Sequence, residues 1–249
     1  MKKILVSSFI FISLFTFAAS SIHAAVLSAG ASTWYTTWDL PSEAGVEIDP
    51  FLLYGPLLSV KVSQDFSLST VFLYSNFDAV SPEDPAYSQP EITFDMTRID
   101  SDTALNYRLT DKLKLITGLK VMWYKMAATY PADPPAMPEP QEIESTHYGL
   151  GPALGLSLTI PLYGNFFLMG NLSAMYLWTT STHQELDDEH SHEYGFNAGV
   201  SVAYYIAKAS VTVMLGGRYQ SFTSDEADDD EPWSTFYGVT LGAVYSFKI

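Results

Sequence analysis

The chain has 249 residues, 47% of them hydrophobic and 16% charged, with a formal net charge of −16 and no cysteine. A chain this acidic repels the phosphates of nucleic acids, so we expect no nucleic-acid partner. The lack of cysteine excludes disulfides and a lipid anchor on cysteine.

Residues 1–25 have the three parts of a secretory signal peptide. Two lysines follow Met1, an apolar run extends from Ile4 to Ala19, and small residues lead to Ala24 and Ala25. We expect cleavage after Ala24 or Ala25, because the run is too short to span a bilayer comfortably; an N-terminal helical anchor is the alternative. Cleavage leaves 10 basic residues against all 28 acids, a net charge of −18, and a single domain over residues 26–249.

Beyond the leader, apolar residues alternate with small or polar ones, which is the period of a β-strand. In the last segment, for example, Tyr237, Val239 and Leu241 alternate with Gly238 and Thr240. The pattern predicts an all-β chain of ten strands, at residues 26–39, 51–63, 66–77, 92–109, 113–126, 147–162, 166–180, 194–207, 210–223 and 233–249.

The composition of the two strand faces distinguishes a membrane barrel from a soluble one. A sheet that faces water carries many Lys, Glu and Asp on its wet face. Here one face carries Leu, Val and aromatic residues, and the other is mostly Gly, Ala, Ser, Thr and Asn. This predicts lipid outside and a lumen of small residues inside, and a soluble sandwich or lipocalin-like barrel is the weaker alternative.

The connections between the strands alternate in length. Short turns are predicted at 64–65, 111–112, 164–165 and 208–209, and long loops near 40–50, 78–91, 127–146, 182–193 and 224–232. Outer-membrane barrels join an even number of strands by short periplasmic turns and long external loops. Aromatic residues near the long loops predict one girdle, and a second lies near the short turns at Phe66, Tyr107, Phe166, Tyr204, Tyr245 and Phe247.

The leader, the ten alternating segments and the ending Tyr245-Ser246-Phe247-Lys248-Ile249 resemble Gram-negative outer-membrane β-barrel proteins. The resemblance covers the mature chain and implies a transmembrane antiparallel up-and-down β-barrel in the bacterial outer membrane. The ending is similar to the C-terminal assembly signal of that class, which usually finishes in Phe or Trp, whereas this chain finishes in Ile249. The implied partners are outer-membrane lipid, lipopolysaccharide and, through the last strand, the barrel assembly machinery.

Two prolines fall inside predicted strands. Pro56 and Pro152 each follow a glycine, and proline has no N–H to donate to the ladder. We expect bulges or local breaks in the strands there.

Strand alternation also assigns the charged residues of the strands to the lumen. A lysine or arginine that faces lipid at mid-depth costs about 2–4 kcal/mol, so these side chains are expected to point inward. The predicted lumen charges are Lys61, Arg98, Asp100, Asp102, Arg108, Lys114, Lys120 and Arg218. Two interpretations remain: a salt-bridged filling that closes the lumen, which the small diameter of ten strands favours, or a narrow pore whose basic wall admits anions.

The long loops, counted from Asp39 at the end of the first strand, hold 23 of the 28 acids and no Lys or Arg. Solvation and repulsion between neighbouring molecules explain such loops, and capture of divalent cations is the alternative, since carboxylates suit Ca²⁺ and Mg²⁺. No other cofactor is expected. The fourth loop contains the histidine cluster, for which we name His183, Asp187, His190 and His192 as candidate ligands of a transition metal. A polar loop with incidental histidines is the competing interpretation.

The fourth loop also bears on whether the protein is an enzyme. Asp188-Glu189-His190 is similar to the Asp-x-His pair of the omptin proteases, in which an Asp polarises a His that activates water. The omptin pattern also needs an Asp-x-Asp pair on the second loop, and the nearest such pair here, Asp100 and Asp102, lies lower in a strand. We therefore expect no enzyme, and assign a structural or surface-interaction role with a closed or narrow lumen. A narrow porin-like channel and an omptin-like protease are the alternatives.

Overall fold

The structure is a computed structural model that describes residues 26–39, 46–82, 91–131, 140–184, 188–225 and 234–248. The predicted signal peptide and Asp187 lie outside these ranges. No helix in the described part of the chain is long and apolar enough to cross a membrane.

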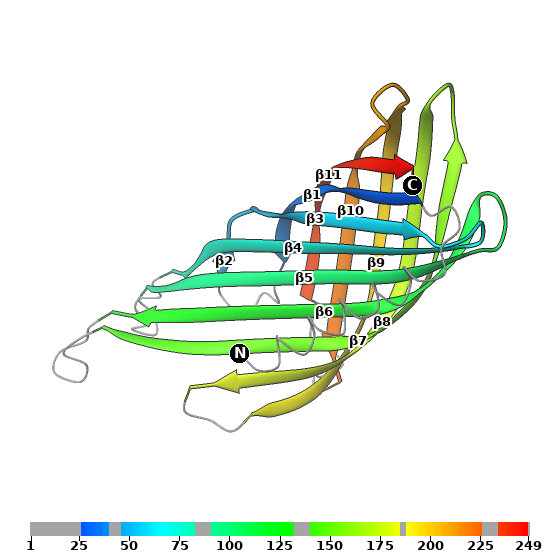
Figure 1. Ribbon diagram of the computed structural model, residues 1–249. Helices are drawn as coiled ribbons and strands as arrows, with labels where there is room; N and C mark the ends of the chain where they lie inside the picture. The colour runs from blue at the N-terminus through cyan, green and yellow to red at the C-terminus, as the bar shows by residue number, and fades with distance from the viewer. Residues whose placement is uncertain are drawn as a thin grey trace.

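The described chain folds into antiparallel strands that follow one another around a barrel (Figure 1). The strands are β1 (Val26–Asp39), β2 (Glu47–Ile48), β3 (Phe51–Lys61), β4 (Phe66–Ser81), β5 (Ile92–Arg108), β6 (Leu113–Tyr130), β7 (Gln141–Pro161), β8 (Phe166–His183), β9 (Glu189–Ile206), β10 (Val211–Ser224) and β11 (Ser234–Lys248).

The barrel closes by pairing between its first and last strands. β1 pairs with β11 from Val26↔Lys248 to Asp39↔Thr235, and with β3 on its other edge. Figure 1 shows these two strands side by side, in blue and red. The ten long strands form the closed wall, and the two-residue β2 adds a short pairing to the outer end of β4. The predicted ten-stranded up-and-down barrel is confirmed.

Several strands continue further toward the long loops than the alternation predicts. β4, β6 and β8 end later, and β7 and β9 begin at Gln141 and Glu189 instead of 147 and 194. A membrane crossing needs only about 9–11 residues of strand. Above the membrane the ladder continues, as in the pair Tyr130↔Gln141, but polar side chains on both faces remove the apolar alternation.

The lipid-facing side of the barrel is the one that the alternation predicts. Leu154, Leu156, Val200, Val239 and Leu241 are all exposed on the outer wall. All six aromatic residues of the predicted periplasmic girdle are exposed as well, and they pair as Phe66–Tyr107, Phe166–Tyr204 and Tyr245–Phe247 with ring centroids 4.6–4.9 Å apart. Amphipathic rings in such a row suit the boundary between hydrocarbon and water.

Both prolines interrupt the ladder without changing its register. Pairing of β3 with β4 stops after Tyr54↔Tyr74 and resumes at Leu57↔Val71, and pairing of β7 with β8 stops after Leu150↔Trp178 and resumes at Ala153↔Met175. The same number of residues is skipped on both strands, so no bulge is inserted. The predicted local breaks are present, and each lies at the residue that has no N–H.

Candidate functional site

A buried group of charges crosses the middle of the lumen, and its centre is Asp100 on β5. Arg98 Nη2 donates to Asp100 Oδ2 at 2.8 Å, and Lys120 Nζ from β6 donates to Asp100 Oδ1. All three side chains are at most 1% exposed. Arg98 Nη2 also donates to Gln220 Oε1 on β10, at 3.3 Å, which links the charges across the barrel.

Asp102 extends this group toward β9 and β10. Its carboxylate lies 3.1 Å from Lys120 Nζ and accepts a hydrogen bond of 2.7 Å from Arg218 Nη2. Arg218 Nε donates to Asn197 Oδ1 at 2.8 Å. Three cations and two carboxylates therefore form one network, hereafter the ionic plug (Arg98, Asp100, Asp102, Lys120 and Arg218), with a net charge of +1.

Aromatic rings enclose the arginines of the ionic plug. The Arg98 guanidinium carbon lies 3.7 Å from the ring centroid of Phe236 and 5.1 Å from that of Tyr124, and the Arg218 carbon lies 4.5 Å from that of Trp34. Within the described residues, Arg98 Nε and Nη1 have no hydrogen-bond partner. The electron-rich faces of the rings stabilise this cation where hydrogen-bond acceptors are lacking.

An apolar layer packs around the same level of the lumen. Its largest members, each at most 3% exposed, are Trp34, Leu53, Leu73, Met122, Leu177, Phe222 and Phe236. The expected lumen of small residues is therefore wrong at this level, although glycines on neighbouring strands make the room. A Cβ at Gly195, for example, would lie 2.8 Å from Phe222 Cδ1.

The other three predicted lumen charges do not join the plug. Lys61, Arg108 and Lys114 lie at the short-turn ends of their strands. Arg108 donates to Asp65 Oδ1 from Nε and Nη2 at 3.0 and 2.9 Å, and its side chain is 37% exposed. Alternation along the strands thus identifies the inward face, but it does not give the depth of a residue in the lumen. Depth is what separates the five charges of the ionic plug from the three at the rim.

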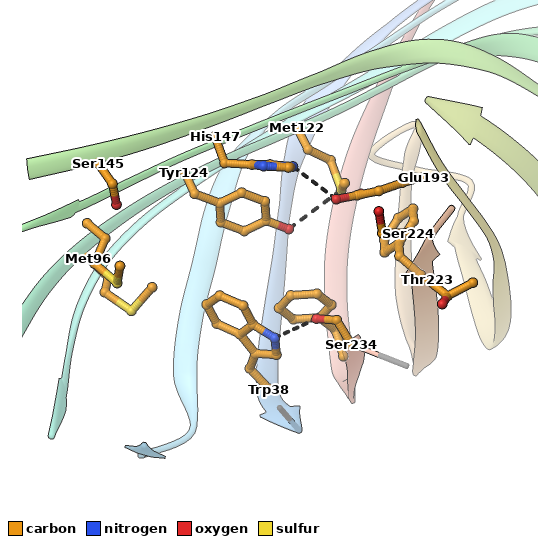
Figure 2. A pocket seen from close by; sticks show the side chains of 13 residues that line it. Trp38, Met96, Met122, Tyr124, Ser145, His147, Glu193, Thr223, Ser224 and Ser234 are labelled. Atoms are coloured by element: carbon orange, nitrogen blue, oxygen red, sulfur yellow. Dashed lines mark hydrogen bonds and ion pairs between the residues drawn. The ribbon is translucent and has the colours of Figure 1, made fainter. Parts of the chain in front are cut away.

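A cavity of about 330 Å³ opens between the apolar layer and the ends of the strands that lead to the long loops (Figure 2). Its lining is Trp38, Met96, Met122, Tyr124, Met126, Ser145, His147, Glu193, Phe222, Thr223, Ser224, Ser234 and Phe236. Figure 2 shows His147 and Glu193 joined across the cavity, with the Tyr124 hydroxyl directed at the same carboxylate. His147 Nε2 lies 3.1 Å from Glu193 Oε1, and Trp38 Nε1 donates to Ser234 Oγ at 2.8 Å.

The strand pattern does not reveal this cavity, because some of its polar members fall in predicted loops. Glu193 and Ser145 lie in the predicted fourth and third loops, whereas in the structure they belong to β9 and β7. When the period-two pattern of β9 is extended by one residue toward the long loop, Glu193 falls on the face opposite to that of the lipid-facing Tyr194. That phase is the signal that would have assigned Glu193 to the lumen.

The four candidate metal ligands are not brought together. Alternation along β8 places His183 on the lumen side of the wall, whereas His190 and His192 share the outer face of β9, and Asp187 lies outside the described residues. His190 Nδ1 lies 3.1 Å from Thr180 Oγ1. The described residues contain no group of three or more His, Cys, Asp or Glu that could hold a metal ion.

His192 instead ties β9 to the outer end of β10. Its amide donates to Asp225 Oδ1 at 2.9 Å, and its Nδ1 lies 3.0 Å from Asp225 Oδ2. The hydrogen bond from the His192 amide, and then that from its ring, hold the pKa of Asp225 below its ordinary value.

Asp188 and His190, the two members of the Asp-x-His pair, have different hydrogen-bond partners. Asp188 Oδ1 accepts a hydrogen bond from Thr182 Oγ1 at 2.7 Å, while His190 contacts Thr180. Asp100 and Asp102, the nearest Asp-x-Asp pair, are held in the ionic plug. These contacts do not bring the Asp-x-His pair and the Asp-x-Asp pair together, as the protease alternative requires.

No protein-family model matches the chain, and no curated protein sequence matches it. The outer-membrane protease OmpT from Escherichia coli is similar in structure, with 13% identity, a TM-score of 0.49 and coverage of 90% of this chain and 96% of that one. The translocator domain of the autotransporter NalP from Neisseria meningitidis has 10% identity and a TM-score of 0.49, and the match covers 97% of this chain and 95% of that one. The Pseudomonas putida toluene transporter TodX has 10% identity and a TM-score of 0.38, with coverage of 93% of this chain and 91% of that one. Likenesses at this level assign no activity.

Location follows from the barrel itself. A closed antiparallel barrel with an apolar outer wall and an aromatic girdle is built to stand in a bilayer with its lumen shielded from lipid. The described residues form a closed β-barrel whose wall is suited to cross a membrane.

Proposed function

We propose that this barrel does not conduct, and that it serves at the cell surface through its external end. The observation that carries the proposal is the ionic plug with its apolar layer. Arg98, Lys120, Trp34, Leu53 and Leu177 are all 0% exposed, and they come from β5, β6, β1, β3 and β8. Side chains contributed from around the whole wall thus exclude water at one level of the lumen.

The plug also argues against an anion pore. A conducting basic wall needs cations that face water, whereas here Asp100 and Asp102 neutralise two of the three cations and aromatic rings cover Arg98. The external end is different: it has an open cavity, and the sequence segments that connect the strands at this end are acidic. The polar groups that a ligand could reach therefore lie at the external end of the barrel, which suits a surface-interaction role.

Planar-bilayer recording tests the proposal. The purified wild-type barrel is expected to give no steady unitary current. A variant in which Trp34, Arg98 and Phe236 are all replaced by alanine removes large side chains of the ionic plug and of its apolar layer, and it is expected to conduct. Steady wild-type currents that change in Arg98→Ala or Lys120→Ala would show that the lumen is a pore.

A further inference from the structure

Three side chains at the external mouth of the lumen are joined in a row. His147 on β7 lies directly opposite Ser181 on β8, and His147 Nδ1 is 3.0 Å from Ser181 Oγ. The other ring nitrogen, Nε2, is 3.1 Å from Glu193 Oε1 on β9. We call Ser181, His147 and Glu193 the mouth triad.

The mouth triad has the connectivity of an activated nucleophile. When Nε2 carries the ring proton, it donates to Glu193, and Nδ1 is free to accept the proton of the Ser181 hydroxyl. A hydroxyl, an imidazole base and a carboxylate that orients the base are the parts that acyl-transfer enzymes need. Either imidazole nitrogen serves as a base, since the hydrogen bond of one nitrogen fixes the tautomer of the other.

The other described histidines show that this arrangement is not a general consequence of strand pairing. His190 contacts the hydroxyl of Thr180 at 3.1 Å, but no carboxylate of the described residues is bonded to its ring. His192 contacts the carboxylate of Asp225 at 3.0 Å, but no hydroxyl is bonded to its ring. Within the described residues, only His147 holds both.

The cavity below the mouth triad suggests the substrate. His147 and Glu193 belong to its lining and are 26% and 17% exposed, so they are partly shielded but reachable. The nearby walls are the side chains of Met96, Met122 and Met126, and the rings of Trp38 and Phe236. Thioether and aromatic surfaces favour an apolar chain, and about 330 Å³ suits a short one.

We propose that Ser181 is a nucleophile that takes acyl groups from esters with a short apolar acyl chain, with His147 as its base and Glu193 as the residue that positions His147. Ser181 Oγ forms a bond to the ester carbonyl carbon as its proton passes to His147 Nδ1. The bond to the alcohol oxygen breaks, and that oxygen leaves with the same proton. Water then attacks the acyl-Ser181, gives a proton to His147 and releases the carboxylic acid, as the proton returns to Ser181.

A fluorophosphonate probe tests the nucleophile in the full-length barrel, folded in detergent or lipid vesicles. Mass spectrometry is expected to find the adduct on Ser181. Ser181→Ala should carry no adduct, His147→Ala should react at least about 100-fold more slowly, and Glu193→Gln at least about 10-fold more slowly. The matched control is Ser191→Ala, whose hydroxyl lies 2.8 Å from Thr179 Oγ1 and touches no imidazole; it should react as the wild type does.

Folding is checked for each variant by the electrophoretic shift between heated and unheated samples. Absence of an adduct on Ser181 in the folded wild type, or equal rates in folded His147→Ala and wild type, would overturn the proposal. p-Nitrophenyl hexanoate should be hydrolysed faster than the acetate, and equal or absent hydrolysis would overturn the assigned substrate.

Discussion

At the scale of single residues, the free energy of the lumen depends most on Asp100. This carboxylate is 1% exposed and contacts Arg98 and Lys120 directly, with Arg218 at 3.8 Å. Burial of a charge is tolerated only when partners replace its lost hydration. Asp100 therefore makes the burial of three cations possible at the same level of the barrel.

We expect Asp100→Asn to destabilise the barrel by about 3–5 kcal/mol, because it leaves buried cations with one carboxylate fewer. Urea unfolding in lipid vesicles, followed by tryptophan fluorescence, measures the change. The control is Asp65→Asn, which removes the partner of Arg108 at an ion pair whose side chains are 37% and 52% exposed. That exposed pair should contribute less than about 1 kcal/mol. Similar losses in both variants would mean that the plug is open to water.

At the scale of elements, neighbouring strands fit because glycine stands where a large inward side chain needs room. Gly195 on β9 is such a place: a Cβ there would lie 2.1 Å from the Ser221 carbonyl oxygen and 2.8 Å from Phe222 Cδ1. Gly170 on β8 has open space, since the nearest atom to its Cβ would be 3.8 Å away.

Gly195→Ala is accordingly expected to cost about 1–3 kcal/mol, since the strand must shift to avoid overpacking. Gly170→Ala, an equally small change in the neighbouring strand, should leave the urea midpoint nearly unchanged. Equal midpoints for the two variants would contradict the close packing of β9 on β10.

The sequence predicts the strands well but their outer ends and the lumen poorly. Period-two alternation is imposed by lipid on one side, so it identifies the ten strands and the outward face, as at Leu154 and Val239. Above the membrane both faces are polar, and the alternation no longer shows that β7 and β9 continue. Glu193 therefore falls in a predicted loop, although in the structure it belongs to β9 and lines the cavity.

The lumen itself depends on contacts between strands far apart in the chain. Trp34, Arg98 and Phe236 meet from β1, β5 and β11, at separations that no local pattern encodes. Alternation gives Arg98 and Asp100 an inward phase, but it does not indicate that methionines and aromatic rings pack at the same level. Inward position is a local property of the strand, whereas packing partners follow from closure of the whole barrel.

At the scale of the whole molecule, the barrel is organised in layers along its axis: a rim at the short turns, the ionic plug with its apolar layer, the cavity, and the mouth that carries Glu193. The layers depend on hydrocarbon surrounding the outer wall, because the large apolar side chains there have no other cover. Leu154 is 60% exposed near the middle of the long strand β7, so it is among the side chains that meet this environment.

Leu154→Arg tests that environment directly. An arginine facing lipid near mid-depth is expected to destabilise the barrel by about 2–4 kcal/mol in lipid vesicles. The same substitution at Tyr163, which is 89% exposed in the short turn between β7 and β8, should cost little, because the turn stands in water. Unfolding both variants in urea compares them. If Leu154→Arg unfolds at the wild-type midpoint, water rather than lipid surrounds the wall, and the assignment of the barrel to a membrane is wrong.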